Sequence, residues 1–113
     1  MTSTANFFPA AEVRVATDLD HLGKLANWFD ATFEPIEGST GEIWWLTKDG
    51  EDPVAVVYLA VGRDDDAFLP VVAHEATHAA MYYMERIGED KPSHEFMAYT
   101  VESFARAIEG QVG

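Results

Sequence analysis

Residues 67–87 read AFLPVVAHEATHAAMYYMERI, and this stretch decides the fold. Apolar residues recur in it at the spacing of an α-helix, and Gly88 follows as a natural helix stop. On a helical projection one side is apolar and comprises Leu69, Val72, Ala76, Ala79, Ala80, Tyr83 and Ile87. The other side carries His74, His78, Met81 and Glu85. The pattern predicts a helix that packs on a sheet and turns its histidines towards a cleft.

The segments around this helix predict an α+β domain. A last helix is expected over residues 94–109, with Ser93 as its N-cap. Upstream, we expect a strand over 11–17 and a helix from Asp18 or Asp20 to about Phe33. Two β-rich runs, 42–47 and 54–61, flank an Asp-Gly turn signal and predict a hairpin. The expected fold is a single α+β domain over 11–113 with a small antiparallel sheet, preceded by a loose tail at 1–10.

Composition narrows the possible functions. The chain has 113 residues, no cysteine and a formal net charge of −13. The lack of cysteine excludes disulfides, thiol catalysis and cysteine-bound zinc. The negative charge argues against nucleic acid as a ligand, because phosphates would be repelled. The sequence also lacks a signal peptide and a membrane-length apolar run, so a cytoplasmic protein without a membrane partner is expected.

Within the 67–87 helix, residues 74–78 form an H-E-x-x-H motif. Residues four apart lie one turn apart on the same helix face, so His74 and His78 can bind one Zn²⁺ ion. Glu75 projects to one side of the pair and can act as general base on a zinc-bound water. The motif therefore predicts a zinc site and the hydrolysis of a peptide or protein substrate.

A catalytic zinc site usually has three protein ligands, so a third must come from elsewhere. The 94–109 helix offers His94, Glu95 and Glu102. Glu95 is preferred, although His94 lies nearer the apolar stripe of that helix and Glu102 shares the face of Glu95. Tyr99 lies one turn after Glu95, and its phenol could donate a hydrogen bond to an oxyanion.

Two segments, HEATHA at 74–79 and EFMAY at 95–99, resemble the small gluzincin-type metallopeptidases, above all those encoded in phage and prophage genomes. The resemblance covers about residues 71–104. It implies zinc bound by His74, His78 and Glu95, with Glu75 as base. It also implies a minimal zincin-like fold for the domain and a host-cell cytoplasmic location. The third ligand follows the histidines at a shorter spacing than in larger members of that family, which keeps Glu102 as an alternative.

Two other functions fit the sequence. The charge of −13 suits an acidic protein of phage origin that mimics nucleic acid towards a basic partner. Alternatively, a zinc site can persist in a domain that has lost catalysis. The sequence leaves open which hairpin strand would bind a substrate and whether the chain is a monomer.

Overall fold

The structure, a computed structural model, describes residues 11–47 and 51–112. The tail expected at 1–10 and the Asp-Gly pair of the hairpin turn lie outside this range. The elements follow in the order β1 (Glu12–Ala16), α1 (Leu19–Phe29), β2 (Gly41–Leu46), β3 (Val54–Leu59), α2 (Phe68–Arg86) and α3 (His94–Glu109). The predicted α+β class is confirmed. None of the helices in these residues is long and apolar enough to cross a membrane.

The three strands form one mixed sheet in the order β1-β3-β2. β2 and β3 pair antiparallel, as predicted for a hairpin, but β1 pairs parallel to β3. The sheet is therefore not the purely antiparallel one that was expected. The reason is the connection after β1: α1 and the loop that follows bring the chain back to the end of the sheet where β2 begins, and β3 then runs in the direction of β1.

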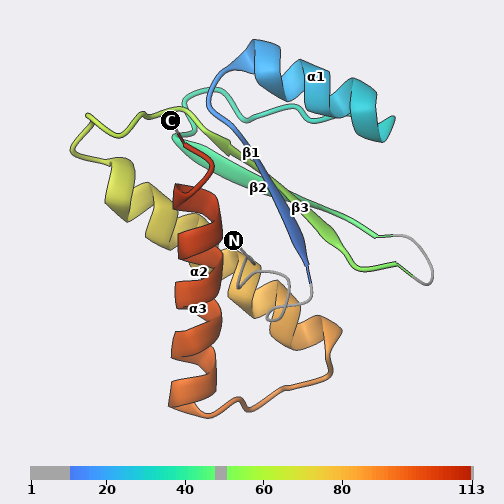
Figure 1. Cartoon of the computed structure of the whole chain (residues 1–113), viewed down its shortest axis with the longest axis vertical. Helices are drawn as coiled ribbons and strands as arrows, with labels where there is room; N and C mark the ends of the chain where they lie inside the picture. Colours follow the sequence, from blue (N-terminus) through green and yellow to red (C-terminus); the bar gives the residue numbers. More distant parts are fainter. Residues whose placement is uncertain (1–10, 48–50, 113) are drawn as a thin grey trace.

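The helices cover the two faces of the sheet unequally. Figure 1 shows α1 on one face, and α2 and α3 crossing each other on the other face. The larger core lies between the sheet and α2 and α3, and it includes Val13, Val57, Leu59, Ala76 and Phe104. Alternation along β3 sends Val57 to this core and Val56 to a smaller core under α1, with Leu22 and Phe33.

Both ends of α1 have a local cause. The Asp18 side chain accepts a hydrogen bond of 2.7 Å from the backbone N–H of His21, as an N-cap does. The helix ends before Asp30, which has the left-handed φ of 52°. It is therefore shorter than predicted, and Phe33 lies in the following loop, where its ring packs 5.3 Å from that of Trp44.

Arg63, in the loop after β3, joins that loop to the end of α3. Its guanidinium donates hydrogen bonds to the backbone oxygens of Val112 (3.0 Å) and Glu109 (2.6 Å). It also lies 5.4 Å from the ring centre of Phe68 at the start of α2. A cation suits the last turn of a helix, where unpaired carbonyl groups point outwards. Arg63 thus fixes α3 relative to α2.

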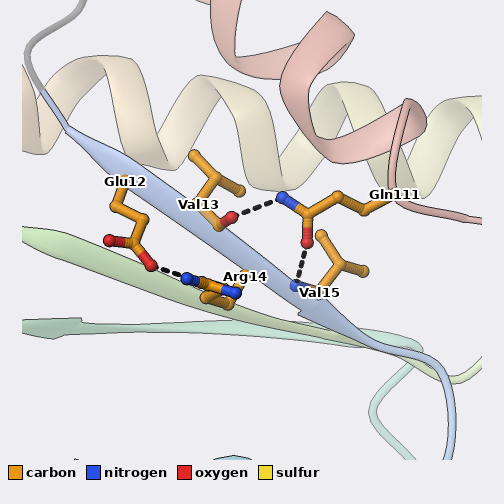
Figure 2. A network of polar contacts seen from close by, with 5 residues as sticks. All are labelled: Glu12, Val13, Arg14, Val15 and Gln111. Carbon is orange, nitrogen blue, oxygen red and sulfur yellow. Dashed lines mark hydrogen bonds and ion pairs between the residues drawn. The ribbon is translucent and has the colours of Figure 1, made fainter. Parts of the chain in front are cut away.

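Gln111 occupies the outer edge of β1. Figure 2 shows its side-chain amide donating to the Val13 carbonyl and accepting from the Val15 N–H, the second bond measuring 2.9 Å. One side chain thereby satisfies a donor and an acceptor that a neighbouring strand would otherwise pair. An unpaired strand edge is a template for association with another chain. Gln111 therefore closes this edge of the sheet.

We predict that Gln111→Ala makes the Val15 amide exchange with solvent faster and lowers the free energy of unfolding by about 1 kcal/mol, the usual contribution of such hydrogen bonds. Hydrogen exchange by NMR and urea unfolding measure the two effects. Gln111→Glu should give an intermediate result, because it keeps the acceptor for Val15 and loses the donor to Val13. An unchanged exchange rate in Gln111→Ala would contradict this role.

Candidate functional site

Helix α2 brings two imidazoles together on its exposed side. His74 and His78 are both solvent-exposed, and their Nε2 atoms lie 3.1 Å apart. The ring centres are 4.6 Å apart and the ring planes are inclined by 77°. Without a metal, one Nε2–H can donate to the other Nε2, which requires one ring to carry its proton on Nε2. The two ring nitrogens thus already point at one another.

This spacing suits two positions of a zinc site. Tetrahedral zinc with bonds of about 2.0–2.1 Å to imidazole nitrogens places those nitrogens roughly 3.3 Å apart. The observed distance of 3.1 Å is close to that value. The histidine pair therefore fits half of a tetrahedral shell with little rearrangement.

A third ligand is not assembled beside the pair. Within residues 11–47 and 51–112, no group of three His, Cys, Asp or Glu side chains could hold a metal ion. Glu95 and His94 are exposed in the first turn of α3, and Glu102 forms an ion pair of 2.6 Å with Arg106. The structure thus joins His74 to His78 but not to Glu95, whose role as a ligand stays a prediction. Tyr99 is 58% exposed, and no hydrogen bond or ring contact within these ranges joins it to the histidines.

Glu75 has a very different environment from the two histidines beside it. Glu75 is only 3% exposed, whereas both histidines are exposed. Burial raises the pKa of the Glu75 carboxyl, because it disfavours the charged form. Positive charge on His74 and His78 lowers this pKa, and the Glu42 carboxylate raises it. A buried acid with a raised pKa beside two imidazoles is an arrangement typical of proton-transfer sites.

Gly41 explains how a carboxylate can be buried there. A Cβ atom at Gly41 would lie 2.8 Å from Cγ1 of Val71 and 3.1 Å from Oε2 of Glu75. Only a residue without a side chain allows the start of β2 to come this close to α2. Gly41 was not predicted from the sequence to belong to the site, although a glycine in a strand can mark a close approach of another element.

Strand β2 lies beside the histidine face of α2. Tyr82 stacks on Trp45 of β2, with ring centres 4.4 Å apart, while Val71 and Glu75 meet β2 at Gly41. His78 follows Val71 by nearly two helical turns, so it leaves the helix on almost the same side. His78 therefore lies close to the side of α2 that meets β2.

The outer edge of β2 offers backbone groups for pairing. β2 is an edge strand of the described sheet, and the Ala60 N–H donates to the Thr40 carbonyl at 2.9 Å. Because hydrogen-bonded pairs alternate along an antiparallel ladder, Glu42 and Trp44 bond to β3, whereas Ile43 and Trp45 turn their N–H and C=O groups outwards. Among the described residues, Gln111 closes the β1 edge, and no other strand pairs with the outer edge of β2.

The comparisons with known proteins do not place the chain in a family. No protein-family model matches it, and neither a curated protein nor a solved structure is significantly similar. Together with the missing three-ligand group in the described residues, this contradicts the predicted membership of the gluzincin-type metallopeptidases. Two short matching segments were too little to carry a family assignment.

We predict that Gly41→Ala destabilises the protein by about 1–3 kcal/mol, the cost of adding a methyl group to a close-packed contact. Gly23→Ala is the matched control, because a Cβ at Gly23 in α1 meets nothing within 4 Å. The control should gain about 0.5–1 kcal/mol, since glycine is unfavourable inside a helix. Urea unfolding compares the two variants. Equal effects would show that β2 and α2 are not in close contact.

The raised pKa of Glu75 makes the stability of the fold depend on pH. The pKa of Glu75 is raised in the folded chain, so ionising this carboxyl costs more free energy in the folded than in the unfolded chain. The free energy of unfolding therefore falls as the pH rises above the ordinary glutamate pKa of about 4.3. In metal-free protein, Glu75→Gln should therefore be more stable than wild type at pH 7. The difference should vanish as the pH falls below that value, where both side chains are neutral. Thermal unfolding with a chelator present tests this, and a gain that is the same at pH 3.5 and pH 7 would contradict it.

Proposed function

We propose that this protein is a zinc-dependent hydrolase that cleaves peptide bonds. The observation that carries the proposal is the pair of Nε2 atoms, 3.1 Å apart on His74 and His78, directly beside the buried carboxyl of Glu75. His74 and His78 would hold the ion, with Glu95 proposed as the third ligand on sequence grounds. Bound zinc lowers the pKa of a water ligand towards about 7 and polarises a carbonyl group.

Glu75 has the properties that a general base requires. A carboxylate with a raised pKa can accept a proton in one step and return it in the next. It would take the proton of the water that attacks the carbonyl carbon of the substrate. When the carbon–nitrogen bond breaks, the same proton would pass to the leaving amine. Its near-complete burial would keep this proton from exchanging freely with bulk water.

The open edge of β2 supports an extended polypeptide as substrate. The outward N–H and C=O groups of Ile43 and Trp45 could pair with a substrate strand, as in proteins that bind peptides by strand addition. His78 leaves α2 on nearly the same side as Val71, which meets β2 at Gly41. A substrate backbone held along β2 would therefore pass next to the histidine pair. We therefore propose β2 as the strand of the hairpin that binds substrate.

A second candidate is an acidic protein that occupies a basic partner. The net charge is −13, and half of the six cationic side chains in the described residues are neutralised by ion pairs: Arg14 with Glu12, Arg63 with Glu109, and Arg106 with Glu102. Binding of this kind would weaken steeply with salt and would not change in His74→Ala.

A zinc-bound domain without catalysis is a third candidate, and it would bind zinc and cleave nothing.

We predict that Glu75→Gln keeps zinc and loses peptide hydrolysis, because the amide cannot accept the proton from water. The loss should be at least about 10²-fold, the usual contribution of general acid–base catalysis. Cleavage of a mixed peptide library, followed by mass spectrometry, measures it. Glu85→Gln, an exposed position on the same helix, is the matched control and should retain wild-type activity. Full activity in Glu75→Gln would rule out its role as base.

A further inference from the structure

A shallow apolar hollow adjoins the histidine pair on α2. It has a volume of about 350 Å³ and is lined by Pro70, Ala73, His74, Thr77, His78 and Met81. This volume is at the lower end of ligand sites in proteins, so it suits a side chain better than a whole small molecule. Because His74 and His78 themselves line it, a group held at the histidines would extend directly into the hollow.

The lining of the hollow is uncharged apart from the imidazoles. Pro70, Ala73 and Met81 offer only apolar atoms. Thr77 adds little polarity, because its hydroxyl donates a hydrogen bond of 2.8 Å to the Ala73 carbonyl within the helix. Met81 is 54% exposed although it is apolar, and its flexible thioether can adapt to different partners. An apolar side chain that covers this lining is removed from water, which favours binding. A charged side chain in the same place would be buried without a partner, which disfavours binding.

The position of the hollow relative to β2 suits a side chain of the same substrate. Val71, Glu75 and Tyr82 mark the side of α2 that faces β2. At the helical spacing of about 100° per residue, Pro70 and Met81 lie on the far side of the histidines from β2. A backbone paired with β2 could therefore direct one side chain across the histidines and away from the sheet.

We propose that this hollow selects substrates with a large apolar side chain, such as leucine or phenylalanine, next to the bond to be cleaved. The inference rests on the proposed function, because it takes the histidine pair as the place where that bond is held. It assigns to Pro70, Ala73 and Met81 the role of specificity-determining residues. It adds a chemical class of substrate that the histidine motif by itself does not specify.

The test measures binding separately from cleavage. The Glu75→Gln protein, labelled with ¹³C in its four methionine methyl groups, would be titrated with peptides that differ only in carrying Leu, Phe, Lys or Glu at one central position. The Leu and Phe peptides should shift the Met81 methyl signal and bind at least about tenfold more tightly than the charged ones. Met97, which packs against the main core, should not shift. An unmoved Met81 signal, or equal affinities for the four peptides, would overturn the inference.

A pair of variants completes the test. Met81→Glu should remove the preference for Leu and Phe, whereas Ile87→Glu should keep it, because Ile87 is also exposed but does not line the hollow. If wild type binds the Leu peptide at Met81 but cleaves nothing, the hollow is supported and the proposed hydrolase function is contradicted. If wild type cleaves all four peptides equally well, the hydrolase function stands and the apolar selectivity is refuted.

Discussion

The close approach of β2 to α2 at Gly41 is the constraint on which the site depends. Val71 and Glu75 lie where a side chain at Gly41 would otherwise be. This contact sets the rotation of α2 about its own axis, so that Ala76 and Ala79 enter the core and the histidines stay outside. It also buries Glu75 and brings the open edge of β2 next to His78. The lack of a side chain at Gly41 thus determines both the burial of Glu75 and the exposure of the two histidines.

The order of helices and strands could be predicted because local signals are strong. Ser93 caps α3 as expected, and apolar periodicity located α2 to within a residue at each end. Prediction from the sequence fails where tertiary contacts override the local pattern. Leu69 and Ile87 belong to the predicted apolar stripe but are 64% and 48% exposed, because they lie at the two ends of α2. The parallel pairing of β1 could not be read from its own residues, since it depends on the path of the chain through α1.

The site was predictable in part, for a related reason. The i, i+4 spacing is a property of the helix alone, so His74 and His78 converge as the motif predicts. A third ligand depends on how α3 is placed relative to α2, and in the described residues no such ligand joins the pair. The burial of Glu75 depends on Gly41, more than thirty positions earlier in the chain. Resemblance over two short segments could not supply these long-range facts, and the family assignment based on it was wrong.

The proposed function requires that His74 and His78 bind zinc. Elemental analysis of untagged protein, purified without added metal, tests it most directly when wild type is compared with His78→Ala and with His21→Ala, an exposed histidine on α1. We expect about one zinc ion per chain in wild type and in His21→Ala, and none in His78→Ala. Zinc absent from wild type even after the metal is added, or bound equally by His78→Ala, would contradict the claim.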